Sequence, residues 1–392
     1  MVVITECFNN SWKACMRSGR YITQPNQYKA FIPASLPPNP PIRMEGELQH
    51  LLTDAGIAIG KLDTMGYLAP NLNHIIAMYV RKEALLSSQI EGTQASLEDI
   101  FEYENKIPLK NVNDVEEVVN YIKALNYGMN RLNEFPMSIR LIKEIHSMLL
   151  EGVRGKDKTP GEFKKSQNWI GPIGSTPSTA SFIPPPPKEA MDAMGELELF
   201  LHKSSDIPLL ISCALIHYQF ETIHPFLDGN GRLGRLLITF YLYWKKALQY
   251  PTLYLSYYFK IHRQEYYDRL NLVREQGDYE QWIVFFLKGI IWTCNSALQT
   301  IKNVLQLQET HKKRLIEKKL STPYAIALLD YLFEKPHLSI KDVSIHLHIS
   351  YQSAKTLMHQ LVSFEILKEI TGKRRDKRYS YWEYLALLSE GT

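Results

Sequence analysis

A stretch of twelve residues, HPFLDGNGRLGR over 224–235, holds side chains that can act together on a phosphate. His224 precedes a proline, which disfavours helical geometry before it, so we expect the imidazole at the mouth of the apolar helix 208–220. Two glycines around an asparagine predict a tight turn whose N–H groups begin the next helix and can bind an anion. Arg232 and Arg235 lie three residues apart and share one face of that helix.

The chemistry indicated by this stretch is that of a nucleotide polyphosphate. Two guanidinium groups beside the positive end of a helix repel each other unless an anion lies between them. Asp228 adds a carboxylate that can hold a hard divalent cation such as Mg²⁺. Each part also has a structural interpretation, because a histidine beside a buried helix is often a hydrogen-bonding core residue and Asp-Gly is ordinary turn chemistry. Their concentration between two apolar helices favours a phosphate site.

The elements that position this stretch are predicted to be mainly helical. A stripe of apolar residues predicts a helix from Leu72 to about Gly92. Two more helices are expected between 112 and 150, separated at Phe135-Pro136, and further apolar stripes follow 208–220. Other segments are expected to be extended or looped: a Pro-rich arm over 31–42, and a long loop or hairpin flap over 151–187 with extended pieces at 168–171 and 179–187.

The last part of the chain predicts a separate unit. The helix that passes Thr293 becomes basic and looks like a solvated connector. Helices expected at 323–333, 339–346 and 351–364, followed by a strand, a basic loop and a strand, resemble a winged helix-turn-helix. The wing carries Lys373, Arg374, Arg375, Lys377 and Arg378. One interpretation is contact with DNA phosphates, although the helix 351–364 has one Lys and no Arg for reading bases; protein contact or dimerisation is the alternative.

Composition excludes several classes of protein. The 392 residues allow two or three domains, and 45% hydrophobic with 22% charged residues excludes a disordered, collagen-like or fibrous chain. Because 45 basic residues stand against 41 acidic ones, binding to a polyanion through global charge is also excluded. Four scattered cysteines predict reduced thiols. The N-terminus does not resemble a signal peptide and no apolar window is long enough for a membrane span, so we expect a cytoplasmic protein.

The stretch at 224–235 resembles the HPFx(D/E)GNGRxxR motif of the Fic family at every specified position. The similarity extends to RKEALLSSQIEGT, to TPGEFKKSQNWIG with SFIPPPP, and to the helices around YYFKIHRQEYYDRL. It implies a Fic-type helical bundle with a small β-hairpin flap. Together with the helical patterns and the winged-helix pattern described above, the expected fold is mainly α with a C-terminal winged helix-turn-helix domain. We therefore expect an N-terminal helical region with the Pro-rich arm over 1–110, a catalytic core over 111–300, a helical connector over 301–320 and the winged-helix domain over 321–392.

The resemblance implies transfer of AMP from ATP to a Ser, Thr or Tyr hydroxyl of a protein, which can be the chain itself. His224 would be the general base and Asp228 would hold Mg²⁺. The turn 229–231 would cradle the transferring phosphate, while the two arginines neutralise charge further along. Flap residues would also bind the target segment, and two tyrosines would line the adenosine pocket or simply pack. The residues expected around the nucleotide are Glu91, Thr179, Ala180, Ser181, Phe182, His224, Gly229, Asn230, Gly231, Arg232, Leu233, Gly234, Arg235, Tyr266 and Tyr267.

An internal inhibitor is predicted before the core. The segment from Ser87 to Gly92 resembles the family's inhibitory (S/T)xxxE(G/N) motif. By itself Glu91 reads as a surface acid, but it is also a natural counter-charge for the arginine pair. We hypothesise that Glu91 pairs with Arg235, so that ATP binds in an unproductive pose. Release would need a population shift of the helix, through oligomerisation (a homodimer, for example) or target binding.

Two other functions stay open at this point. The same residues can serve removal of AMP from a modified protein, or transfer of another group such as UMP or phosphocholine. Alternatively, the chain is a DNA-binding regulator whose ATP site only senses nucleotide. The sequence contains no readable signature of a particular target protein.

Overall fold

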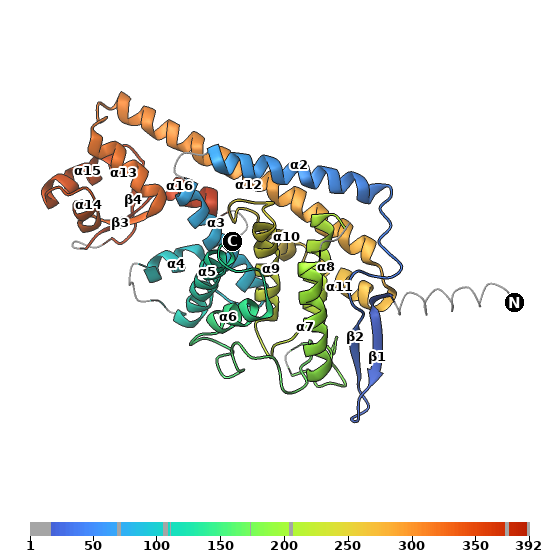
Figure 1. Ribbon diagram of the computed structural model, residues 1–392. Coiled ribbons are helices and arrows are strands. Elements are labelled where there is room, and N and C mark those ends of the chain that lie inside the picture. The colour runs from blue at the N-terminus through green and yellow to red at the C-terminus, as the bar shows by residue number, and fades with distance from the viewer. Residues whose placement is uncertain are drawn as a thin grey trace.

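The structure of the protein is a computed structural model, and it describes residues 17–68, 72–104, 109, 111–172, 174–203, 207–372 and 376–389. Most of these residues are helical, and the strands form two small antiparallel sheets at opposite ends of the molecule (Figure 1). The prediction of a mainly α protein is confirmed. Between the two sheets stand the helices that carry the motif at 224–235.

The central helices follow one another along residues 47–317. They are α2 (Glu47–Leu68), α3 (Leu72–Ile90), α4 (Leu97–Glu104), α5 (Val112–Leu132), α6 (Ile139–Leu149), α7 (Pro187–His202), α8 (Leu209–Ile223), α9 (Asn230–Trp244), α10 (Ser256–Ile261), α11 (Arg263–Gln276) and α12 (Tyr279–Glu317). The expected helices at 72–92, 112–150 and 208–220 are therefore present, with the break at Phe135-Pro136 lying between α5 and α6.

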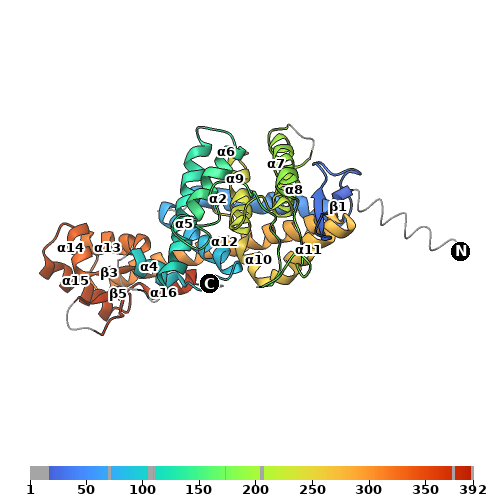
Figure 2. The same ribbon diagram turned by 90° about the horizontal axis from the view of Figure 1, so that it is seen from below.

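Helix α8 lies in the middle of the core. Every residue from Leu210 to Ile223 is buried, as its apolar character on all sides predicts. Helix α9 packs against α8 and against α5, and α3 also contacts α5 and α9. These contacts bring the end of α3, the middle of α5 and the α8–α9 connection to one place, although they lie far apart in the sequence (Figures 1 and 2).

Helices α2 and α12 lie side by side along one edge of the molecule (Figure 1). The connector that we expected over 301–320 is the second half of the continuous helix α12. It is not solvated all round, because Ile301, Val304, His311 and Leu315 are buried. Among the described residues, no helix is both long and apolar enough to cross a lipid bilayer.

The Pro-rich arm begins in a β-hairpin that we did not predict. Strand β1 (Gly19–Thr23) pairs antiparallel with β2 (Lys29–Pro33), and Tyr21 lies opposite Phe31. The following chain lies against α8, where the side-chain amide of Gln219 donates to the Ala34 carbonyl at 2.9 Å. The strands are short and are joined across a Pro-Asn turn, so the proline content of the segment masks their alternation.

The C-terminal unit has the helices expected from sequence and two elements that we did not expect. Its helices are α13 (Pro323–Glu334), α14 (Ile340–His346), α15 (Tyr351–Ser363) and α16 (Trp382–Leu388), and its strands are β3 (His337–Ser339), β4 (Lys368–Glu369) and β5 (Arg378–Ser380). The strands form one antiparallel sheet in the order β3-β5-β4. Strand β3 and helix α16 were not predicted. The winged-helix assignment stays a prediction, and wing residues Lys373, Arg374 and Arg375 lie outside the described residues.

Replacing Gly128 by alanine should destabilise the core that supports the motif. Gly128 faces Phe240 across the α5–α9 contact, and an added Cβ would collide with the buried ring. Because overpacking of a close-packed core typically costs 1–3 kcal/mol, we expect the free energy of unfolding to fall by about that amount in urea titrations. Gly195→Ala in α7 is the matched control: nothing lies within 4 Å of the added Cβ, so it should stabilise the chain by roughly 0.5–1 kcal/mol. Equal effects at both positions would contradict the packing argument.

Candidate functional site

The connection between α8 and α9 carries the motif and is closed by its own side chains. His224 follows α8 in the left-handed conformation, with φ 48°, and Gly229 precedes α9 with φ 75°. The Asn230 side chain closes this loop, because its Oδ1 accepts from the Phe226 N–H and its Nδ2 donates to the Phe226 carbonyl, both at 2.9 Å. Any part of Asn230 in a phosphate cradle therefore falls to its backbone N–H. Phe226 is fully buried, so it belongs to the core.

The imidazole of His224 lies at the edge of this loop, with 19% of its side chain exposed. Its Nδ1 points inward, has no hydrogen-bond partner among the described residues and lies 4.0 Å from Oε2 of Glu221. Burial lowers the pKa of His224 to about 3, with the charges of Lys164 and Arg274 acting in the same direction. This pKa is below the ordinary value of a histidine because the imidazole is buried among cations, and it keeps the imidazole in the neutral form that accepts a proton.

Two side chains from the first part of the flap segment 151–187 hold the backbone of this loop. The ammonium of Lys164 donates to the His224 carbonyl at 3.0 Å, and the amide of Asn168 donates to the carbonyls of His224 and Phe226 at 3.0 and 2.7 Å. Lys164 is buried, and burial lowers its pKa to about 7. We did not single out either residue from sequence, because a lysine in the polar run GEFKKSQN looks like a solvated one.

The guanidinium group of Arg235 is buried and is held by Ser87 of α3 and by Glu91, which follows α3. It donates from Nε to Ser87 Oγ at 2.8 Å, and from Nη2 to the Ser87 carbonyl at 2.9 Å and to Glu91 Oε1 at 2.7 Å. Burial opposes both charges, yet Arg235 lowers the pKa of Glu91 and Glu91 raises the pKa of Arg235. The contact that we hypothesised between Glu91 and Arg235 is thus present in the structure.

Two glycines make this contact possible. Gly92 follows Glu91 directly with φ 95°, so the chain turns away as soon as α3 has ended. Gly231 lies in the first turn of α9, where an added Cβ would collide with Glu91 Oε1 and lie 3.1 Å from Arg235 Nη1. The carboxylate of Glu91 therefore rests directly on the start of α9, at the position where the sequence predicts an anion.

The second arginine has a different partner, which we did not predict. Arg232 is buried, and its Nη1 donates to Oε2 of Glu117 on α5 at 3.3 Å. The same oxygen accepts from Thr93 at 2.8 Å and from Arg154 at 3.2 Å. Nε of Arg232 has no hydrogen-bond partner within the described ranges. The predicted phosphate contact of Arg232 would have to coexist with this network.

The backbone of Asp228 is fixed by His146 of α6. Nδ1 of His146 accepts from the Gly161 N–H at 2.8 Å, so Nε2 carries the proton and donates to the Asp228 carbonyl at 2.9 Å. The ring also stacks on Phe226, with centroids 3.7 Å apart. Burial lowers the pKa of His146 to about 4, which keeps it neutral. The Asp228 carboxylate stays partly exposed beside the loop, where Oδ1 accepts from the Gly229 N–H at 2.6 Å.

A resident metal site is not evident in the described part of the chain. No cluster of three or more His, Cys, Asp or Glu side chains there could hold an ion. A single carboxylate nevertheless fits Mg²⁺ that arrives with a nucleotide, because this ion usually keeps waters and binds one or two carboxylates plus phosphate oxygens. Asp228 fits that description, with Oδ2 facing the loop at Gly155.

Comparison with known families agrees with this geometry. Residues 136–242 match the Fic/DOC family, and residues 49–130 match the Fic/DOC family N-terminal region. Residues 136–242 are therefore similar to a Fic domain, and we call them the Fic-like domain. It runs from just before α6 to near the end of α9, and the matched N-terminal region contains α3 with Glu91.

Relatives of the chain carry the same family name. It is 27% identical over 258 residues to a protein named protein adenylyltransferase Fic from Drosophila willistoni, covering 62% of this chain and 48% of the relative. The protein of that name from Drosophila melanogaster is 28% identical over 241 residues, covering 58% and 45%. The chain thus spans about half the length of these relatives.

Solved structures show the same fold at lower identity. A Fic family protein from Desulfovibrio desulfuricans G20 is 21% identical with a TM-score of 0.58, covering 87% of this chain and 97% of its own. A Fic domain containing signaling protein from Bacteroides thetaiotaomicron is 19% identical with a TM-score of 0.51, covering 64% and 97%.

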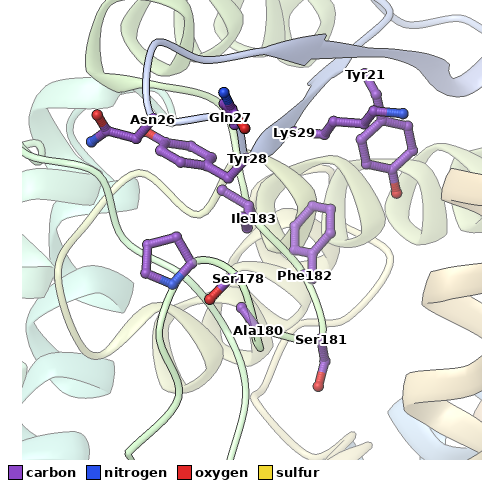
Figure 3. A pocket seen from close by; sticks show the side chains of 11 residues that line it. Tyr21, Asn26, Gln27, Tyr28, Lys29, Ser178, Ala180, Ser181, Phe182 and Ile183 are labelled. Atoms are coloured by element: carbon purple, nitrogen blue, oxygen red, sulfur yellow. The ribbon is translucent and has the colours of Figure 1, made fainter.

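The flap of the Fic-like domain is less regular than a hairpin. Ile170 and Phe182 form a single antiparallel bridge, with N···O distances of 2.9 and 3.1 Å. On its other side the flap meets the β1–β2 hairpin, since the Phe31 N–H donates to the Ile183 carbonyl at 2.9 Å. A groove of about 780 Å³ lies between residues 21–29 of the hairpin and 177–183 of the flap (Figure 3).

The four flap residues expected to border the nucleotide differ in their positions. Ala180, Ser181 and Phe182 line the groove beside the hairpin (Figure 3). Thr179 turns back on its own loop, where its hydroxyl accepts from the Thr176 N–H at 2.9 Å. The flap therefore presents its groove to the hairpin side.

The two tyrosines that we expected to line an adenosine pocket are not equivalent in the structure. Tyr266 is only 1% exposed, and its hydroxyl donates to Nε2 of His217, whose Nδ1 donates to the Gly234 carbonyl. Tyr266 thus supports α9 from within the core, which favours the packing alternative for this residue. Tyr267 is half-buried and stays a candidate. Leu233 is fully buried, so its side chain is core as well.

Proposed function

We propose that the Fic-like domain transfers AMP from ATP to a Ser, Thr or Tyr hydroxyl of a protein and releases pyrophosphate. The observation that carries this proposal is the pairing of the buried Arg235 with the carboxylate of Glu91 at the start of α9. A place that holds a carboxylate oxygen against a guanidinium group and a helix start suits a phosphate oxygen equally well. The name of the curated relatives, protein adenylyltransferase, supports AMP as the transferred group.

The reaction needs one base and several phosphate contacts. The target's hydroxyl oxygen attacks the α-phosphorus of ATP, the bond from that phosphorus to the bridging oxygen of the β-phosphate breaks, and pyrophosphate leaves with the electron pair. His224 takes the hydroxyl proton, a role that its neutral state permits. ATP enters as its Mg²⁺ complex, and Asp228 would hold that ion. Backbone N–H groups of Gly229 and Gly231 would face the transferring phosphate, while Arg235 neutralises charge further along.

We propose that Glu91 restrains this activity. Its carboxylate occupies the contact on Arg235 that a γ-phosphate would need. ATP would then have to displace Glu91 or bind in a pose that misplaces the α-phosphorus. Because Ser87 holds Arg235 from the same helix, a shift of the C-terminal end of α3 would release both contacts together. Oligomerisation or target binding could supply that shift.

The groove between flap and hairpin is the proposed place for an extended segment of the target protein. Backbone groups at Ser181 belong to the flap edge next to the Phe31–Ile183 contact, and Lys29 lies on the facing hairpin (Figure 3). An extended chain can pair with such an edge, and its hydroxyl residue would then be directed toward the loop at His224. The target can be another protein or a second copy of this chain.

The position of the label in ATP tests the proposed reaction. Incubation with a cell lysate and ATP labelled at the α-phosphate should leave acid-stable label on protein, whereas label at the γ-phosphate should leave with pyrophosphate. Retention of the γ-label alone would instead indicate phosphorylation. If neither form of labelled ATP leaves label on protein, even with the Glu91→Gly variant, the proposal is overturned. Release of AMP from a previously labelled protein, without added ATP, would favour removal of AMP; the same assay with UTP or CDP-choline tests the other transferred groups.

For the C-terminal unit we propose a winged-helix domain whose wing contacts either DNA phosphates or another protein. In the described part of the wing, Lys377 lies 3.6 Å from Glu369, so one of its charges is already balanced. Retention of the full chain on double-stranded DNA at 50 mM salt, lost at 200 mM, would support phosphate contacts. Absence of retention at 50 mM would remove DNA from the possible partners and leave protein contact or dimerisation.

A further inference from the structure

A buried carboxyl group faces the inner nitrogen of His224. Glu221 lies one helical turn before His224, and its side chain is 8% exposed. Its Oε2 lies 4.0 Å from Nδ1 of the imidazole, and that nitrogen has no hydrogen-bond partner among the residues described. Oε1 of Glu221 is likewise buried without a partner there. The backbone of Glu221 also approaches this imidazole and acts on its pKa. The two side chains nevertheless face each other inside the protein without a hydrogen bond between them. Such a pair points to a side-chain contact that forms when one of the groups changes its charge.

The fold makes space for this carboxyl group. Gly234 of α9 packs against it, and an added Cβ at that position would collide with Glu221 Oε1 and lie 3.2 Å from the ring of Phe220. The α8–α9 contact therefore contains a slot that fits a carboxyl group. An apolar side chain in place of Glu221 would satisfy packing equally well, so packing alone does not account for an acid there.

We propose that Glu221 is a positioning residue for His224: it accepts the Nδ1–H, which fixes the tautomer whose Nε2 takes the proton of the target hydroxyl. This inference rests on the proposed function. When the hydroxyl proton moves to Nε2 and its oxygen bonds to the α-phosphorus, the imidazole becomes a cation. The carboxylate of Glu221 then stabilises that cation at Nδ1, and the proton later passes from Nε2 to solvent.

The charges around Glu221 decide when it is ionised. Arg235 of α9 and Arg274 of α11 favour the carboxylate, Glu91 beyond α3 opposes it, and the hydroxyl of Tyr266 is neutral. Burial is the largest effect and raises the pKa of Glu221 to about 7. The carboxylate is therefore present above pH 7 and protonated below it. If Glu221 assists His224, kcat should rise with pH through this range, although His224 itself stays neutral throughout. Lys164, which holds the His224 carbonyl, also has its pKa lowered to about 7, so the contribution of Glu221 is the part of the rise that Glu221→Gln removes.

Two substitutions separate charge from hydrogen bonding. Glu221→Gln keeps an acceptor oxygen but no charge, so kcat for adenylate transfer at pH 8 should fall about 10-fold, and the rise of kcat near pH 7 should disappear. Glu221→Ala removes the acceptor as well, so kcat at pH 8 should fall about 100-fold. KM for ATP should change little in both, because Glu221 acts through His224. Glu83→Gln is the matched control: Glu83 is also buried with its pKa raised to about 7, but it accepts from Ser256 and Tyr121 instead of facing His224. The rise of kcat near pH 7 should remain in Glu83→Gln.

Nitrogen-15 spectra of the imidazole test the contact without any turnover. At pH 8 we expect Nδ1 of His224 to carry the proton in the wild type, with the signal assigned by its loss in His224→Ala. Glu221→Ala should shift the tautomer toward Nε2–H, whereas Glu83→Gln should not. Unchanged spectra and unchanged kcat in Glu221→Ala would overturn the inference and leave the proposed function standing. A Glu221-dependent tautomer in a chain without adenylate transfer would support the contact and refute the proposed function.

Glu221→Gln should fold as well as the wild type, because the buried carboxylate destabilises the folded state above pH 7 and the neutral amide does not. Since the folded pKa of Glu221 is raised from 4.5 to about 7, the folded chain binds a proton more tightly than the unfolded chain between these values. The free energy of unfolding contributed by this carboxyl group therefore falls as pH rises to about 7 and the group ionises. Glu221→Gln should unfold at the same or a higher urea concentration than the wild type at pH 8.

Discussion

Replacing His224 by alanine should abolish transfer of adenylate from ATP to protein. The imidazole is the general base of the proposed reaction, and general bases typically contribute factors of 100 to 10,000. We therefore expect labelling from α-labelled ATP to fall at least about 100-fold. Nucleotide binding should persist, because Arg235 and the N–H groups at the start of α9 do not depend on this side chain. Labelling and calorimetric binding of MgATP, measured on the same preparation, check both statements.

The matched control for this substitution is His50→Ala. His50 is exposed on α2, away from the α8–α9 connection, and its removal should leave labelling unchanged. Loss of MgATP binding together with labelling in His224→Ala would mean that the imidazole shapes the loop instead of acting as a base. Full labelling would exclude His224 from catalysis and with it the proposed order of proton transfer.

The spacing of residues in the motif predicted its local structure well. A proline after His224 ends α8, and glycines around Asn230 give the turn that begins α9. These features follow from short-range backbone preferences, which a sequence displays directly. The Glu91–Arg235 contact came from resemblance, because residues 144 positions apart have no local signal that joins them.

The groups that complete the site could not be predicted for the same reason. Glu117 on α5 balances Arg232, and Lys164 holds the carbonyl of His224. Each is a charged residue in a polar segment, and in the sequence a solvated charge and a buried one look alike. Glu221 differs from these residues, because its position in the sequence does indicate that it is buried. It is an acid inside the apolar run PLLISCALIHYQFETI, where an acidic side chain must be buried because every face of α8 is covered.

The fold outside the core shows a related limit. The basic residues of ETHKKRLIEKK indicated a solvated connector, yet α12 buries His311 and Leu315 on one face. His311 Nδ1 lies 2.9 Å from the Tyr381 hydroxyl at the start of α16, a helix that we did not predict. Long charged side chains leave one stripe of a helix free for packing, so a high charge content does not exclude burial.

Replacing Glu91 by glycine should raise adenylate transfer. In the wild type, the Glu91 carboxylate holds Arg235 at 2.7 Å, and that contact must break before a phosphate can take its place. Hydrogen bonds between charged groups contribute roughly 1.5–3 kcal/mol, so removing this competitor corresponds to an increase of about 10- to 100-fold in labelling at a fixed ATP concentration. Initial rates from α-labelled ATP, at several ATP concentrations, measure it. The labelling rate of Glu91→Gln should lie between those of the wild type and Glu91→Gly, because the amide still fills the space but carries no charge.

A matched glycine substitution separates this effect from loosening of a helix end. Glu134 also follows a helix end and pairs with an arginine, Arg131, at 3.1 Å, but that pair is on the surface. Glu134→Gly should leave labelling unchanged. The double variant with Glu91→Gly and Arg235→Ala sharpens the argument: if Glu91 acts only by occupying Arg235, then removing the arginine should cancel the gain. A gain that survives without Arg235 would mean that Glu91 restrains the domain through the position of α3 itself, and that the ion pair is a consequence of this position and not its cause.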